Sequence, residues 1–256
     1  MNYSRVLIMA NKWVYLSPHF DDIALSVGGL VWEQVHKGDQ VEVWTICGGN
    51  APQDKPLSLF AKILHSIWKL GDDVPNLRNQ EDENACHRLG AAHRRFLWPD
   101  CIYRYNPTTN RPFVKFQRDL FKPYTPIEYN LLVEMFKTVS MPQDAQVVAP
   151  LGVGNHRDHK LTRAIAEHLY GSIWHYLDYP YAVQNDFKRE DFIPQSTEKM
   201  IQPISSKGLV AWKEAVACHH SQIALFWKSD QEMYTAIDAY AEKMQKDFLN
   251  TYLWKF

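Results

Sequence analysis

A strand–helix–strand pattern in the first fifty residues restricts the fold more than any other feature of this chain. Residues 13–17 (Trp-Val-Tyr-Leu-Ser) form a short apolar run that is typical of a buried strand. Apolar residues then recur at three- and four-residue spacing from 24 to 35, which indicates a helix, and Gly38 is placed to end it. A second apolar run at residues 41–47 completes a βαβ unit, which requires a parallel sheet with a right-handed crossover.

The alternation of strands and helices continues through most of the chain. We predict further helices near residues 57–70, 80–89, 126–139 and 158–170, and further strands near 95–98, 146–150 and 174–179. Residues 180–205 are predicted to form a loop, and residues 208–248 to be mostly helical. The chain is therefore predicted to be one domain, residues 1–256, with a Rossmann-like three-layer α/β/α sandwich, a mainly parallel sheet and a helical C-terminal part.

Residues 101–125 interrupt this pattern as an irregular insert that is rich in Pro, Tyr, Asn and Arg. A stretch of this length without periodicity is usually a functional loop or a disordered segment. Its aromatic residues are compatible with an apolar lid over a substrate or with packing of the insert against the rest of the domain. Packing is favoured, because large aromatic side chains are mostly buried.

The composition argues against several classes of protein. With 28 basic and 29 acidic residues the net charge is -1, which gives no reason to expect a nucleic-acid or anionic-membrane partner. The four cysteines form no CxxC pair, so neither a thiolate zinc site nor a disulfide framework is indicated. No apolar run approaches the roughly 20 residues that span a bilayer, and the N-terminus lacks the apolar core of a secretory signal. We expect a cytoplasmic protein, and a homo-oligomer is compatible with the sequence.

Two polar motifs follow predicted strands. Pro18-His19-Phe20-Asp21-Asp22 comes directly after the first strand, and His156-Arg157-Asp158-His159 comes shortly after the strand at residues 146–150. Ligands of open α/β sheets bind outside the carboxyl ends of the strands, so the two motifs are predicted to share one site. Either motif alone is also typical of a helix N-cap, where aspartates favour the helix dipole. Their occurrence at two strand ends favours chemistry.

The motifs supply a ligand set for one metal ion. We predict that His19, Asp22 and His159 bind it, because two imidazoles and a carboxylate occur in several hydrolytic zinc sites that keep a fourth position open. Zinc is favoured by the imidazoles, although iron or cobalt would also fit such a set. The sequence therefore predicts a metal-assisted hydrolase.

The remaining residues of the motifs are candidates for proton transfer and orientation. Asp21 is predicted to be the general base that takes a proton from the attacking water. His156 is predicted to stabilise the oxyanion or to share the acid role. Asp158 is predicted to orient a histidine, because ligating imidazoles usually donate their second N–H to a carboxylate or carbonyl.

The two motifs together resemble those of the PIG-L/LmbE family of zinc-dependent N-acetyl deacetylases. The family's first motif, Pro/Ala-His-Pro-Asp-Asp-Glu, is similar to residues 18–23, and its His-x-Asp-His motif is matched by residues 156–159. Weaker matches lie between and after the two motifs. A family spacing is followed by Arg78, Glu81, Ala85, Leu89 and Gly90. The family's Leu-Pro-Asp element resembles Trp98-Pro99-Asp100, and its C-terminal element resembles Lys213 with His219-His220-Ser221-Gln222. The resemblance covers roughly residues 13–222.

The resemblance implies a Rossmann-like fold and hydrolysis of an acetamido group, usually on an N-acetylglucosamine unit. It implies zinc held by the same three residues and Asp21 as the base, and it places Arg78 and Asp100 where family members contact the sugar. This chain departs from the family pattern at Phe20 and Ile23, and it has Gly154 where some members carry a tyrosine that polarises the carbonyl. The oxyanion would then be stabilised by the metal and His156, or by a tyrosine from elsewhere.

Two other functions are alternatives to the deacetylase. A nucleotide-binding or glycosyl-transferring Rossmann protein usually has a glycine-rich turn after its first strand, whereas here Gly28-Gly29 lie well inside the first helix. A catalytically impaired sugar-binding protein is the second alternative. The candidate ligands and Asp21 argue against it.

Overall fold

The computed structural model describes residues 10–71, 73–184 and 187–256, and its main feature is a seven-stranded sheet with the order β3-β2-β1-β6-β7-β9-β8. Its strands are β1 (Lys12–Ser17), β2 (Gln40–Thr45), β3 (Ala92–Arg95), β6 (Ala145–Pro150), β7 (Trp174–Tyr176), β8 (Glu198–Ile201) and β9 (Thr251–Lys255). The first five of these strands are parallel, and β9 is antiparallel to both β7 and β8.

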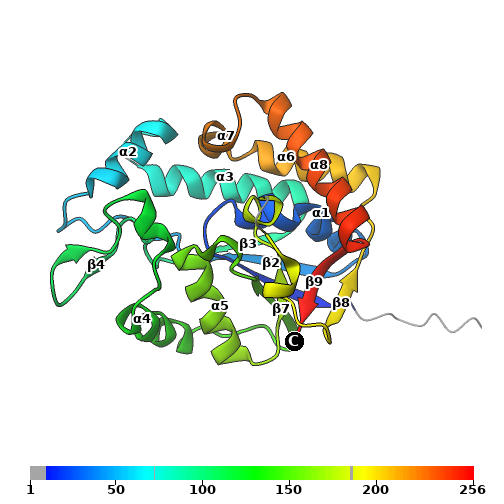
Figure 1. The fold of residues 1–256 in the computed structure, drawn as a ribbon, viewed down its shortest axis with the longest axis horizontal. Coiled ribbons are helices and arrows are strands. Elements are labelled where there is room, and N and C mark those ends of the chain that lie inside the picture. Colours follow the sequence, from blue (N-terminus) through cyan, green and yellow to red (C-terminus); the bar gives the residue numbers. More distant parts are fainter. Residues whose placement is uncertain (1–9, 72, 185–186) are drawn as a thin grey trace, which may run out of the picture.

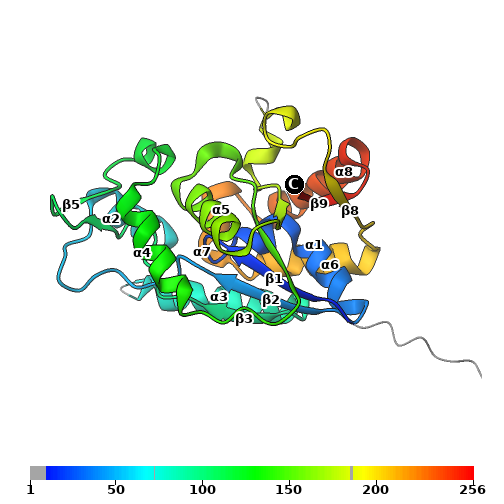
Figure 2. The same cartoon turned by 90° about the horizontal axis from the view of Figure 1, so that it is seen from below.

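Helices cover both faces of this sheet. The longer ones are α1 (Asp22–His36), α2 (Leu59–Trp68), α3 (Val74–Leu89), α4 (Pro126–Lys137), α5 (Arg157–Tyr170), α6 (Ser206–Ala217) and α8 (Asp230–Phe248), and α7 (His220–Phe226) is short. In Figure 1, α1, α3, α6 and α8 lie above the sheet and α4 and α5 lie below it, and Figure 2 turns the same layers by a quarter. The predicted three-layer α/β/α sandwich is confirmed.

Alternating side chains of β1 explain why two helical layers form. Trp13 and Tyr15 belong to the core cluster that includes α1 and α6, whereas Val14 and Leu16 belong to the cluster that includes α4 and α5. Successive residues of a strand point to opposite faces, so a run that is apolar at every position must be covered twice. The continuous apolar pattern of residues 13–16 is therefore the sequence signature of a central strand.

The insert packs against the body of the domain. It contains a hairpin of β4 (Tyr105–Asn106) and β5 (Arg111–Pro112) and the 3-10 turn η1 (Gln117–Phe121). Residues 101–103 and Val114 form a third core cluster with Ala61 and Trp68 of α2. In Figures 1 and 2 the hairpin accordingly lies next to α2 at one end of the molecule.

Several predicted boundaries were wrong. The strand predicted at 95–98 lies at Ala92–Arg95, and α3 begins at Val74 instead of residue 80. The loop predicted at 180–205 contains β8 together with the 3-10 turns η3 (Tyr181–Val183) and η4 (Arg189–Asp191), and β9 was not predicted.

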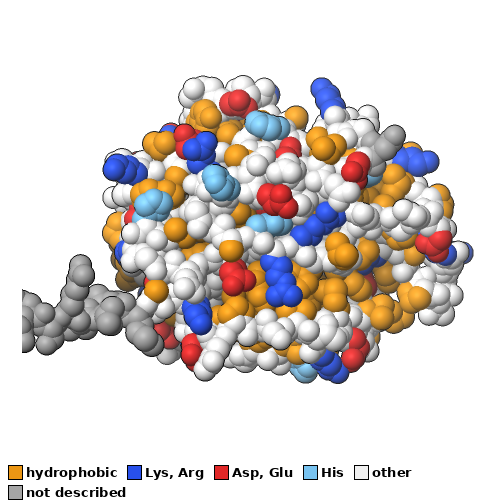
Figure 3. Space-filling view, turned by 180° about the vertical axis from the view of Figure 1, so that it is seen from behind, with side chains coloured by type: hydrophobic (Ala, Val, Ile, Leu, Met, Phe, Trp, Pro, Cys, Tyr) orange, Lys and Arg blue, Asp and Glu red, His pale blue; other side chains and the backbone are white. Residues whose placement is uncertain are grey.

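Two further findings concern the charge of the surface and the hydropathy of the helices. Acidic and basic side chains are interspersed on the face seen in Figure 3, in keeping with the net charge of -1. Across the part of the chain that the structure describes, no helix is both long and apolar enough for a membrane crossing.

Candidate active site

The two polar motifs meet at the carboxyl ends of β1 and β6, which are neighbours in the sheet. The first motif forms the turn between β1 and α1, and the second opens α5 after β6. Between them lies a pocket of about 180 Å³. Its lining includes His19, Asp21, Asp22, Arg78, Asp100, His156, His159, Tyr181 and Gln222. A larger cavity, of about 450 Å³, is lined by parts of the insert and α4 and shares no lining residue with this pocket.

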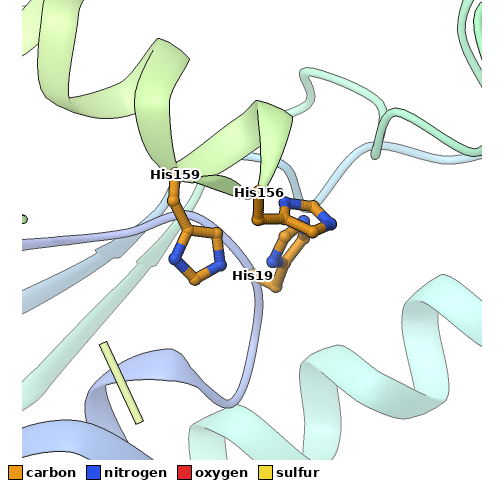
Figure 4. A group of neighbouring side chains, drawn as sticks. All are labelled: His19, His156 and His159. Atoms are coloured by element: carbon orange, nitrogen blue, oxygen red, sulfur yellow. The ribbon is translucent and has the colours of Figure 1, made fainter. Parts of the chain in front are cut away.

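Three imidazoles gather in the pocket, as Figure 4 shows. The ring centroids lie 4.9 Å apart for His19 and His156, 5.0 Å for His156 and His159, and 5.3 Å for His19 and His159. One nitrogen from each ring lies within 4.8 Å of the others, which is close enough for a shared metal ion. All three residues are buried or nearly so.

Asp22 bridges two of these histidines. Its Oδ2 lies 3.2 Å from His19 Nδ1 and accepts the backbone N–H of His19 at 2.7 Å, while its Oδ1 lies 3.4 Å from His159 Nε2. As the first residue of α1 it also lies at the positive end of that helix. Burial by itself would raise the pKa of Asp22, but the two histidines outweigh it and hold the pKa below its usual range. The three predicted ligands therefore lie in mutual contact.

Asp158 lies behind His19 and is fully buried. Its Oδ2 is 3.2 Å from His19 Nε2 and accepts the backbone N–H of Cys101 at 3.0 Å. Its Oδ1 pairs with Arg104, which also donates to Glu128 at 2.9 Å. The histidine that Asp158 contacts is thus the one from the other motif. Sequence reasoning missed Arg104 and Glu128, because neither lies near a motif.

The connection after β7 adds two residues that sequence reasoning missed. Asp178 is fully buried, and its Oδ1 lies 2.6 Å from His159 Nδ1. Its Oδ2 accepts the backbone N–H groups of Gly152 and Val153 at 2.8 and 3.0 Å. Tyr181, three residues on, lines the pocket. The available signal was the Asp-Tyr-Pro-Tyr sequence at the end of the strand predicted at 174–179, because β7 is parallel to β6.

Asp21, Arg78 and Asp100 complete the polar lining of the pocket. Asp21 Oδ1 lies 3.3 Å from Arg78 Nη2, and both side chains are buried. The Arg78 guanidinium is itself held over the Trp68 ring, 4.7 Å from its centroid. Asp100 Oδ2 is 3.8 Å from His19 Nε2. Seven of the eight predicted site residues therefore line one pocket, and the eighth, Asp158, contacts His19.

The electrostatics of the site fit a cation. Burial by itself would lower the pKa of His19, but the carboxylates of Asp100 and Asp158 outweigh it and raise the pKa well above its usual value. For His156, burial and the neighbouring His19 and His159 lower the pKa instead. A buried cluster of carboxylates and imidazoles that draws in positive charge is suited to a divalent metal ion.

The hydrogen-bond partners indicate which ring nitrogens are free to bind a metal. Asp178 takes the Nδ1–H of His159, which leaves Nε2 with its lone pair beside Asp22. His19 faces a carboxylate with each nitrogen, Asp158 at Nε2 and Asp22 at Nδ1, both at 3.2 Å, so a metal beside Asp22 would take the place of the proton on Nδ1. His156 Nδ1 instead accepts the backbone N–H of Asp158 at 3.3 Å, so its Nε2 carries a proton and is a donor. The residues present therefore fit a metal held by His19, Asp22 and His159.

Comparisons with known proteins identify similar chains. Residues 14–170 match the family model described as GlcNAc-PI de-N-acetylase, PIG-L. A 2'-N-acetylparomamine deacetylase from Niallia circulans is 31% identical over an alignment of 127 residues. The match covers 43% of this chain and 43% of the relative, so it spans less than half of either protein. The zinc-inhibited form of teicoplanin deacetylase Orf2 matches with a TM-score of 0.76 at 25% identity, covering 96% of this chain and 97% of that one. A40926 pseudoaglycone deacetylase Dbv21 matches with a TM-score of 0.68, also at 25% identity, covering 96% of each chain.

Proposed function

The chain belongs to the PIG-L family, and we propose that it is a metal-dependent deacetylase that hydrolyses the N-acetyl group of an amino sugar or of a conjugate containing one. Relatives that act as deacetylases support this activity, among them the paromamine and teicoplanin enzymes. The observation that carries the proposal is the contact of Asp22 with His19 Nδ1 and His159 Nε2, beside Asp21, in one pocket. Nothing in the site favours the nucleotide-binding or impaired alternatives.

His19, Asp22 and His159 are the proposed metal ligands. A zinc ion bound there would supply Lewis acidity to the amide carbonyl and make water a better nucleophile near neutral pH. Asp178 would hold the imidazole of His159 in the ligating tautomer, and Asp158 would do the same for His19. Iron or cobalt suits the same donors.

Asp21 is the proposed general base. Its carboxylate lines the pocket, where Arg78 orients it at 3.3 Å. It accepts a proton from the water that attacks the amide carbon, and it returns that proton to the nitrogen of the leaving amine. The Nε2–H of His156 is a donor for the oxygen that gains negative charge.

Arg78 and Asp100 are the proposed contacts to the sugar. Both line the pocket beside the histidines, and a guanidinium and a carboxylate recognise hydroxyl groups as donor and acceptor, respectively. The apolar side chains of Trp68, Leu120 and Phe226 form another part of the lining. A pocket lined by both polar and apolar side chains suits an amino sugar that carries an apolar substituent.

Two variants distinguish a metal ligand, Asp22, from the general base, Asp21. We expect about one zinc per chain in the wild type and acetate release from at least one member of a panel of N-acetylglucosamine conjugates. Asp22→Ala should lose both the metal and the activity, because a ligand is missing. Asp21→Asn should keep the metal and lose turnover by at least a hundredfold, because only the base is missing.

Asp144→Asn, at an exposed aspartate, is the matched control and should behave as wild type. Chelation should abolish acetate release, and added zinc should restore it. A wild type that binds no metal and releases no acetate after addition of zinc, iron or cobalt would contradict the proposal.

A further inference from the structure

Tyr181 is one of two tyrosines that line the pocket, with Tyr179, and its ring lies against Gly154, two residues before the second motif. It opens the 3-10 turn η3, directly after the segment that delivers Asp178. Its ring lies edge-on to His159 at 6.0 Å between centroids, and Phe121 contacts it edge-on at 6.4 Å. Tyr181 therefore has the ring of a proposed metal ligand as a direct neighbour.

Gly154 makes room for this ring. A Cβ atom at position 154 would lie 2.3 Å from both Cγ and Cδ1 of Tyr181, which is far inside van der Waals contact. The residue also has a φ of +81°, a conformation that strains any L side chain. No side chain can therefore reach the pocket from position 154. The space that such a side chain would fill is occupied by the ring of Tyr181.

The other tyrosines near the pocket are engaged elsewhere. Tyr179, which also lines it, packs against Tyr240 and Trp227 at 4.8 and 6.3 Å between ring centroids. Tyr103 Oη lies 2.6 Å from His65 Nε2, and Tyr105 donates to the carbonyl of Pro56 at 2.5 Å. Tyr176 donates to the carbonyl of Leu16 at 3.4 Å. Within residues 10–71, 73–184 and 187–256, the Tyr181 hydroxyl has no hydrogen-bond partner although the residue lines the pocket. A phenol has an ordinary pKa of about 10, so it is a proton donor at neutral pH.

We propose that Tyr181 is a catalytic residue that donates a hydrogen bond to the carbonyl oxygen of the scissile amide, an inference that rests on the proposed function. When water adds to the amide carbon, the π electrons of the carbonyl move to its oxygen, and the phenol O–H stabilises that charge while keeping its proton. When the carbon–nitrogen bond breaks, the carbonyl reforms, the acetate leaves and the amine takes its proton from Asp21. The hydrogen bond strengthens only as the charge develops, so it accelerates the chemical step without tightening substrate binding.

The experiment compares Tyr181→Phe with Tyr103→Phe. The first change removes the hydroxyl and keeps the ring over Gly154. We expect kcat to fall roughly a hundredfold, the loss typical of one oxyanion donor, with KM within about threefold and the metal content unchanged. Tyr103→Phe should stay within about threefold of wild type. With an N-trifluoroacetyl substrate, whose carbonyl is already activated, the loss in Tyr181→Phe should shrink to less than tenfold.

Binding of a methylphosphonamidate of the same amino sugar, which mimics the tetrahedral anion, gives a readout that needs no turnover. Its affinity should fall in Tyr181→Phe by about the same factor as kcat. A variant that keeps more than a third of the wild-type kcat, or binds the analogue as tightly, overturns the inference, and so does loss of metal in parallel with activity. A wild type that releases no acetate overturns the proposed function instead, and the analogue still decides whether Tyr181 binds the anion.

Discussion

Arg104 is the residue on which the buried charges behind the pocket depend. Its guanidinium is buried and contacts the carboxylates of Asp158 and Glu128. Replacing it by methionine leaves both carboxylates without this partner, which typically costs about 3–5 kcal/mol. We expect Arg104→Met to lose that much unfolding free energy in urea at pH 7, while Arg118→Met, at an exposed arginine, changes it by less than about 0.5 kcal/mol.

The pH dependence of this loss tests its cause. Burial raises the pKa of Asp158, but Arg104 and His19 outweigh it and hold the pKa well below its usual range. A carboxylate whose folded pKa is lowered contributes stability that is present above its unfolded pKa of about 3.9 and lost as the pH falls toward the folded pKa. The difference in unfolding free energy between wild type and Arg104→Met should therefore be largest near pH 7 and should become smaller below about pH 4. A difference that is constant with pH would mean that packing, not charge, is responsible.

At the residue scale, the sequence alone predicted that the residues of the two motifs lie at one site, but it did not predict the residues that contact them. The meeting of His19 and His159 in one pocket could be predicted because their two motifs follow parallel strands, whose carboxyl ends lie at the same edge of the sheet. Asp178 and Tyr181 could not, because they follow a short strand whose place beside β6 is decided by pairing across the sheet. Arg104 could not, because an arginine in an irregular insert is normally exposed.

At the scale of elements, the connection between β6 and α5 is constrained by Gly154. Gly154 combines a positive φ with the ring of Tyr181, whereas Gly38 has a positive φ of +98° and nothing within 4 Å of its would-be Cβ. Alanine at either position introduces backbone strain of about 1–2 kcal/mol. We expect Gly154→Ala to lose at least tenfold in kcat because the ring must move, and Gly38→Ala to keep its activity. Equal activity of the two variants in acetate release would show that the ring's position is unimportant.

Elements buried on both faces were predictable, and those at the sheet edge were not. β1 and β6 contain unbroken apolar runs at residues 13–16 and 147–150, and β2 is apolar at Val41, Val43 and Trp44, because helices cover both faces of these strands. In contrast, β8 reads Glu-Lys-Met-Ile and is mostly exposed, so only its pairing with β9 makes it a strand. The other edge strand, β3, is polar too, and its pairing with Glu42–Thr45 of β2 explains why it begins three residues before the predicted position.

At the scale of the whole molecule, the C-terminal strand completes the sheet that positions the site. β9 lies between β7 and β8, and its Trp254 is opposite His175 of β7 and packs on Phe248 at 6.0 Å between centroids. Because Trp254 is 1% exposed, Trp254→Ala leaves a cavity that should cost about 3–5 kcal/mol and lower the thermal midpoint by roughly 10 °C. Ile201→Ala, at a 60% exposed residue of β8, is the control and should change stability by less than about 0.5 kcal/mol. Calorimetry of both variants checks this dependence. Equal midpoints would mean that the packing of Trp254 contributes little to stability, whereas the expected gap means that β9 stabilises the sheet in which it pairs with β7, the strand that precedes Asp178.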